Sequence, residues 1–337
     1  FTARAKGDFK MAKHSGSLDL FEMGFHLPNF SQFAANGKII WNWPNQIAVE
    51  RLEMISSEAV AETKLNWSTG TLEVDYIKVF EKDDELLSVE ANFPVPLSTR
   101  SLNEILESEK EISLEINSKP LTLERLSSFL PIPAELSGIF HAEEFNLTGT
   151  FFNPLLNGKI SLKDFQSTVT PQLSPAEIVI EVQTDAKNLI VDFEAKDPAG
   201  QLLKLDGTFP FLPRKWLNQK MIPLDSPLTL TVKNDQLDLR RIQPLTPFIP
   251  NIMGTLNLDL RLSGSLMEPR LNGNINANNL NTSLQPNLPD FGLNLALKTT
   301  NQELTFNGSG KNGTSNFMTI SGNLPLQPET WLGLPES

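Results

Sequence analysis

The side chains that most often bind metals or act as acids and bases are few and scattered in this chain of 337 residues. It has no cysteine, which excludes disulfides, thiolate metal sites and thiol catalysis. Its three histidines, His14, His26 and His141, lack the spacing of an HExxH zinc motif. We therefore expect surface or turn histidines and predict no metal site.

Two segments have part of the pattern of an anion or cation loop. In GSGKNGTS, which begins at Gly308, Lys311 is followed by Asn312 instead of the Ser or Thr of a phosphate loop, and no helix is predicted after it. In EKDDE, which begins at Glu81, the ligand alternation of an EF-hand is missing. We interpret the first as a strand with a hairpin turn and the second as a solvated hairpin tip.

Adjacent acids could suggest glycosidase chemistry, as at Glu143 and Glu144. Neighbours on a strand point to opposite faces, however, so they cannot act on one bond. No catalytic constellation remains. We predict that the chain is not an enzyme and that it uses no cofactor.

The charge balance also excludes a class of partners. The chain has 28 Lys and Arg against 40 Asp and Glu, a formal charge of −12. Nucleic acids are bound through clustered Lys and Arg, so we predict no nucleic-acid partner. The hydrophobic share of 39% with 19 glycines is typical of a folded chain.

No apolar run reaches the roughly 18 residues of a membrane-spanning helix. The uncharged segment from Ile242 to Leu258, for example, is interrupted by Pro244, Pro247 and Pro250. The chain begins at Phe1 without a charged and then apolar leader. We interpret it as a piece of a longer polypeptide.

Apolar and polar residues alternate along several segments, which predicts strands with one apolar and one solvated face. We expect the apolar residues of four such segments to share a face that could hold a ligand; they are Ile178, Ile180 and Val182; Leu228, Leu230 and Val232; Leu256, Leu258, Leu260 and Leu262; and Leu293, Leu295 and Leu297. We predict one polar face that keeps the sheet soluble, with Ile275 and Ala277 on the other face; its residues are Asn272, Asn274, Asn276, Asn278, Asn279 and Asn281.

Turn signals separate these segments about every ten residues and favour an antiparallel meander. They include Asn157-Gly158, Pro198-Ala199-Gly200, Asn272-Gly273 and Asn312-Gly313. Helices are expected only at residues 98–111 and 121–130, as short plugs or connectors.

Glycine and proline recur in the same order at spacings of 115 to 116 residues, which indicates an internal repeat. We predict units at residues 1–97, 98–212 and 213–337, the first a diverged copy, each with about ten strands. The recurring residues are expected to mark turns and strand ends; they are Gly138, Gly149, Pro154, Gly158, Gly207 and Pro210, and then Gly254, Gly264, Pro269, Gly273, Gly322 and Pro325.

The segment GTLNLDLRLSGSLMEPRLNGNINANN, which begins at Gly254, resembles the repeat of the TamB and AsmA-like envelope proteins. In that repeat a strand leads into Ser-Gly, a spaced proline and then Leu-x-Gly before the next strand. GIFHAEEFNLTGTFFNPLLNGKISLKDF, which begins at Gly138, is similar, with Thr148-Gly149 in place of Ser263-Gly264. ELLSVEANFPVPL in the first third resembles the strand that closes such a unit.

The resemblance implies a fold and a role. The fold is all-β, a long curled antiparallel sheet shaped as a trough or β-taco, with few short helices. The role is transfer of phospholipid through the periplasm of a diderm bacterium toward the outer membrane, with an inner-membrane anchor and an Omp85-type barrel partner. The anchor helix is absent from this sequence and no docking terminus is recognisable, so anchor and partner are implied by the family alone.

A physical argument points the same way. Exposing about 30 lipid methylenes to water costs on the order of 20 kcal/mol, which an apolar trough would largely remove. The alternative is a structural β-sandwich or adhesin-like stalk with a sealed core; a β-helical carbohydrate enzyme has no acid pair to support it. Replacing Leu258 or Leu260 by Asp or Glu would block lipid transfer in a trough but unfold a sealed core.

Overall fold

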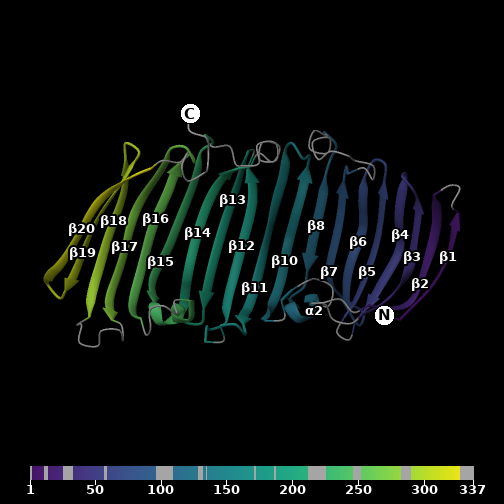
Figure 1. Ribbon diagram of the computed structural model, residues 1–337, viewed down its shortest axis with the longest axis horizontal. Helices are drawn as coiled ribbons and strands as arrows, with labels where there is room; N and C mark the ends of the chain where they lie inside the picture. The colour runs from purple at the N-terminus through teal and green to yellow at the C-terminus, as the bar shows by residue number, and fades with distance from the viewer. Residues whose placement is uncertain are drawn as a thin grey trace. The chain divides into compact units, whose positions relative to one another are not determined.

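The computed structural model describes residues 2–10, 14–25, 33–56, 59–95, 109–127, 132–133, 135–170, 172–185, 187–211, 225–245, 252–281 and 290–326. These residues are nearly all in antiparallel strands, which confirms the predicted fold class (Figure 1). The chain forms two compact units. Unit 1 contains residues 1–165 and 181–186, and unit 2 contains residues 166–180 and 187–337.

Unit 1 is a meander in which each strand from β1 to β7 pairs antiparallel with the next. β8 then pairs with both β7 and β10, and the short β9 extends along β10. The strands are β1 (Thr2–Lys10), β2 (Ser15–Phe25), β3 (Phe33–Asn42), β4 (Gln46–Ile55), β5 (Val60–Ser68), β6 (Leu72–Glu81), β7 (Asp84–Phe93), β8 (Ser113–Ser118), β9 (Leu121–Thr122), β10 (Leu136–Gly149) and β11 (Pro154–Ser167), whose last two residues fall in unit 2.

Unit 2 continues the same pattern, and each strand from β13 to β20 pairs antiparallel with the next. β12 (Ala176–Asp185) contributes residues 176–180 to unit 2 and residues 181–185 to unit 1. The other strands are β13 (Asn188–Asp197), β14 (Gly200–Pro210), β15 (Leu228–Asp238), β16 (Met253–Gly264), β17 (Pro269–Asn281), β18 (Phe291–Thr300), β19 (Glu303–Asn312) and β20 (Ser315–Pro325).

The 115-residue repeat is visible in the backbone. β12, β13 and β14 begin and end 115 residues before β18, β19 and β20. Asp164 and Asn279 have the same rare positive φ, 51° and 52°. Thr184 Oγ1 accepts from the Leu156 amide at 2.8 Å, and Thr299 Oγ1 accepts from the Leu271 amide at 2.9 Å. The repeat is therefore one of hydrogen bonds and torsions as well as of sequence.

The first third carries a copy of the last three strands of the repeat. β5, β6 and β7 begin 116 residues before β12, β13 and β14. One register shift in each of the pairs β6–β7, β13–β14 and β19–β20 leaves a residue of the second strand with no directly opposed residue in the first. These residues, Leu86, Leu202 and Phe317, occupy equivalent positions of the repeat. The predicted unit boundaries at residues 97 and 212 stay a prediction, because the two compact units divide the chain elsewhere.

The expected number of ten strands per repeat was wrong. Among the described residues, the last repeat has six strands, β15 to β20, because each of these strands is 10 to 13 residues long. Some residues that favour turns lie inside strands, so counting them overestimates the number of strands.

Four of the glycines predicted to mark turns lie inside strands instead. Gly158, Gly207, Gly273 and Gly322 lie within β11, β14, β17 and β20. At Gly273, where φ is +150°, a Cβ atom would lie only 2.1 Å from the Asp259 carbonyl oxygen of β16. Close approach of two strands thus explains this glycine, and neither Asn272-Gly273 nor Asn157-Gly158 forms a turn.

The other glycines and prolines predicted to mark turns and strand ends lie at or near strand ends. Asn312-Gly313 and the segment from Pro198 to Gly200 connect consecutive strands, as predicted. Gly149 and Gly264 end β10 and β16, and Gly138 and Gly254 lie near the starts of these strands; Pro154 and Pro269 begin β11 and β17, and Pro210 and Pro325 end β14 and β20.

Helical structure is short. α2 (Leu123–Ser127) lies within the predicted segment 121–130, and η2 (Leu239–Leu245) is a 3-10 helix. Leu121, Leu123 and Leu126 form a small buried cluster with Leu86 of β7. Most of the other predicted helix, residues 98–111, lies outside the described residues. None of the helices in the described ranges is long and apolar enough to cross a membrane.

Candidate functional site: an apolar sheet face

The strand register of unit 2 aligns apolar residues across eight strands. Directly opposed residues of antiparallel strands point to the same face. One such row crosses from β13 to β20 through Phe193, Leu205, Val232, Leu260, Gly273, Leu297, Phe306 and Gly322. Every member of the row is apolar, and the glycines leave it without a polar side chain.

Parallel rows extend this surface along the strands. One contains Gly207, Leu230, Leu262 and Leu271, and it continues through Thr299, whose hydroxyl bonds the Leu271 backbone, to Leu304 and Leu324. Another contains Asn234, Leu258, Ile275, Leu295, Gly308 and Ile320. The only non-apolar members are Thr299 and Asn234, whose amide donates to the Leu202 carbonyl. We call this surface the apolar face of unit 2.

Unit 1 has an equivalent surface, the apolar face of unit 1. One row contains Leu18, Ile39, Val49, Leu65, Val74, Ala91, Leu114 and Leu147. The next row contains Leu20, Gly37, Leu52, Thr63, Ile77, Val89, Ile116 and Phe145.

The opposite face of unit 2 is polar. Lys233, Asp259 and Asn274 are directly opposed there, as are Asn257, Asn276, Asn294 and Ser309. The alternation of Asn272 to Asn278 with Ile275 and Ala277 therefore separates the two faces, as predicted. The prediction does not extend to Asn279, because a register shift with a positive φ of 52° at this residue breaks the alternation. A pocket of about 350 Å³ lies among the side chains of this polar face, including Asn276, Asn294 and Lys311.

The predicted ligand-lining residues are only partly covered. Leu228 is buried, at 5% exposure, and the other twelve are half-buried. Ten of the thirteen lie on the apolar face of unit 2; Ile178, Ile180 and Val182 lie on one side of β12 by their alternation. The facing residues of a two-sheet sandwich would be buried in its core. The apolar side chains here keep part of their surface accessible.

In unit 1, charged residues on the face opposite the apolar face pair with one another. Arg51 donates to Glu62 at 2.6 Å, and this hydrogen bond raises the pKa of the Arg51 guanidinium. Hydrogen bonds to Asp75 and Glu85 likewise raise the pKa values of Lys64 and Lys78. These shifts hold the groups more firmly in their charged forms, so they do not create a base or an acid that works near neutral pH.

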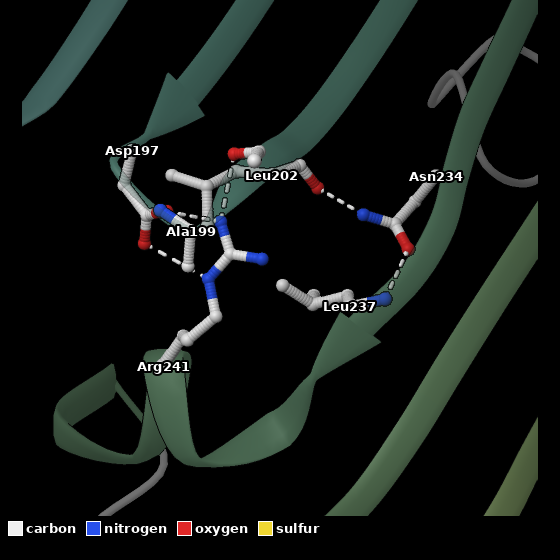
Figure 2. A network of polar contacts seen from close by, with 7 residues as sticks. Asp197, Ala199, Leu202, Asn234, Leu237 and Arg241 are labelled. Carbon is white, nitrogen blue, oxygen red and sulfur yellow. Dashed lines mark hydrogen bonds and ion pairs between the residues drawn. The ribbon is translucent and has the colours of Figure 1, made fainter.

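A buried polar network joins the start of one repeat to the end of the previous one (Figure 2). Arg241 of η2 binds Asp197 at the end of β13, with Nε to Oδ2 at 2.9 Å, and also donates to the Gly200 carbonyl at 2.8 Å. Their side chains are 14% and 5% exposed. Arg125 and Glu81 form the same pair 116 residues earlier, at 2.7 Å. The function of this network is structural, since every member is engaged within the fold.

The other sequence candidates lie apart from one another. His14 is an exposed residue before β2, His141 is half-buried in β10, and His26 lies outside the described residues. Glu81 and Asp84 flank an exposed hairpin tip, and Asn312-Gly313 forms a hairpin turn, both as predicted. Within the described part of the chain, no three His, Asp or Glu side chains gather as a metal site would require.

Several members of the apolar faces were missed by the sequence reasoning. Phe193, Leu205 and Phe306 belong to the row described first, but they lie outside the four alternating segments that the sequence predicts as ligand-lining. Their strands also alternate, but glycines replace apolar residues at some positions and a one-residue bulge shifts the phase of β14. If glycine is counted as an apolar residue, the alternation in these strands also predicts that Phe193, Leu205 and Phe306 lie on the apolar face.

Comparisons with protein-family models, with curated proteins and with solved structures found no match to this chain. The resemblance of the Gly138 and Gly254 segments to envelope proteins therefore rests on their motifs alone.

Proposed function

We propose that this chain is a non-enzymatic conduit or scaffold that holds phospholipid acyl chains against its apolar faces. The observation that carries the proposal is the half-buried state of nine predicted lining residues on β15, β16 and β18, strands whose register aligns their apolar side chains on one face. Attraction between apolar groups is non-directional, so an acyl chain can move between equivalent Leu, Ile and Val positions.

The motif resemblance extends the proposal to a place and a direction. It supports a TamB or AsmA-like role in the periplasm of a diderm bacterium, with transfer toward the outer membrane, an inner-membrane anchor outside this sequence and an Omp85-type barrel partner. The repeat supports this role physically, because each repeat offers a lipid the same kind of apolar surface.

A pair of adjacent residues on β18 tests the proposal. Leu295 lies on the apolar face between Ile275 and Gly308, and Asn294 lies on the polar face. Leu295→Asp places a carboxylate in the acyl-chain path, whereas Asn294→Asp makes an isosteric change outside it. We expect Leu295→Asp to slow transfer of a fluorescent phospholipid between vesicles at least about fivefold, because desolvating a charge is costly. Asn294→Asp should leave the rate unchanged.

Circular dichroism of both variants separates transfer from folding. A trough predicts that Leu295→Asp stays folded, because this side chain is only half-buried. Unfolding of Leu295→Asp, together with no transfer by the unmodified protein, would support the sealed structural module instead.

A further inference from the structure

The outer edge of β20 has apolar side chains that are covered at the equivalent positions of the earlier repeats. Phe317, Ile320 and Leu324 are 56%, 42% and 51% exposed. Their counterparts are buried or half-buried, namely Leu86, Val89 and Phe93 in β7 and Leu202, Leu205 and Phe209 in β14. Among the described residues, β20 pairs only with β19 (Figure 1).

The covering element in both earlier repeats is a strand of the next repeat. β7 pairs with β8, and β14 pairs with β15. In β8, Leu114 lies opposite Ala91 and Ile116 lies opposite Val89. In β15, Leu230 lies opposite Gly207 and Val232 lies opposite Leu205. A leucine thus faces a small residue, and a β-branched residue faces a larger one.

β20 has the same small and large apolar positions that β7 and β14 present to the next strand. Gly322 is equivalent to Ala91 and Gly207, and Ile320 is equivalent to Val89 and Leu205. Both lie on the apolar face, opposite Phe306 and Gly308 of β19. The edge therefore has the small position and the large apolar position that a Leu-x-Ile or Leu-x-Val strand fills.

We propose that the β20 edge is a binding site for an extended protein segment with the pattern of β15, added antiparallel in the β14–β15 register. Such strand addition combines backbone hydrogen bonds, which give affinity, with alternate side chains, which give specificity. Leucine of the incoming segment lies opposite Gly322, and its Ile or Val lies opposite Ile320. The proposal is independent of lipid binding.

Cysteine cross-linking tests both binding and register, because the chain itself has no cysteine. The probe is a synthetic peptide of residues 225–245 of this chain. Thr231 and Lys233 lie opposite Asp206 and Lys204, the counterparts of Ser321 and Thr319. Two protein variants, Ser321→Cys and Thr319→Cys, are each mixed with two peptides carrying Thr231→Cys or Lys233→Cys.

The proposal predicts that the matched pairs, 321 with 231 and 319 with 233, form disulfides at least about tenfold faster than the crossed pairs. Directly opposed residues are about 5 Å apart between Cα atoms, within disulfide reach, and diagonal ones are farther. Equal rates for all four pairs, or no binding of the peptide, would overturn it. Cross-linking to Asp206→Cys instead would show that the peptide displaces β15 and would also overturn it.

A second pair of variants measures the apolar contact. Ile320→Asn should weaken peptide binding about tenfold, because it removes the side chain that meets Val232 of the peptide. Ser321→Asn, a neighbouring change on the polar face, should leave affinity within about twofold. An equal loss in both variants would contradict recognition through the apolar face.

Discussion

At the scale of the residue, an Arg–acid pair recurs between repeats. Arg125 binds Glu81 and Arg241 binds Asp197, and each pair spans 44 residues. The two pairs differ in burial. Glu81 and Arg125 are 40% and 28% exposed, whereas Asp197 and Arg241 are nearly enclosed. Their energetic contributions should therefore differ.

Arg241→Ala should lower the free energy of unfolding by about 3 kcal/mol or more, because it leaves Asp197 buried without its partner. Arg125→Ala should cost no more than about 1 kcal/mol, as is usual for an exposed pair. Urea denaturation of both variants measures the difference. Equal losses would show that burial does not distinguish the two pairs.

The side-chain alternation made the faces of individual strands predictable from the sequence, but not these ion pairs. Asn272 and Ile275 could be assigned to opposite faces from period two alone. The partner of Arg241 could not, since a contact across 44 residues depends on which strands become neighbours. A repeat alignment extended to charged residues would have paired Arg125 with Arg241 and Glu81 with Asp197.

At the scale of the element, close strand packing determines where glycine is required. Gly273 and Gly158 occupy equivalent places in β17 and β11. A Cβ atom at Gly158 would lie 2.5 Å from the Phe145 Cα atom of β10. The sequence predicted turns here because Asn-Gly is the strongest hairpin signal, and that signal carries no information about a neighbouring strand.

Gly273→Ala should lower the free energy of unfolding by about 2 kcal/mol or more, because backbone atoms must move to admit the methyl group. Gly292→Ala is the matched control, since the nearest atom to its Cβ position is 3.5 Å away and its φ is not positive. We expect this control to be neutral or slightly stabilising. A tolerated alanine at 273 would contradict the close-approach explanation.

At the scale of the whole molecule, the formal charge of −12 should influence which membranes the protein approaches. Like charge repels an anionic surface, and this repulsion is screened over about 10 Å at 0.1 M salt and about 3 Å at 1 M. The formal charge follows directly from the composition, and the high β content and the repeat could be predicted from the sequence pattern. The sequence did not reveal whether the apolar side chains were covered, because alternation is the same in a sandwich and in an open sheet.

Lipid transfer from vesicles of anionic phosphatidylglycerol should accordingly be slower than from zwitterionic phosphatidylcholine at 0.02 M salt, by about threefold or more. Raising the salt to 1 M should remove most of this difference. A preference for anionic vesicles that weakens with salt would indicate an attractive basic surface, contrary to the charge argument.

The account depends on acyl chains reaching one face of the sheet and not the other. The most direct measurement is photolabelling of the unmodified protein with a phosphatidylcholine that carries a diazirine on an acyl chain, followed by mass spectrometry of β16 and β18. We expect labels at Leu256, Leu258, Leu260 and Leu262 and at Leu293, Leu295 and Leu297, with Asn257, Asp259, Arg261 and Asn294 unlabelled. Labels spread equally over both sets, or no labels on either strand, would contradict the account.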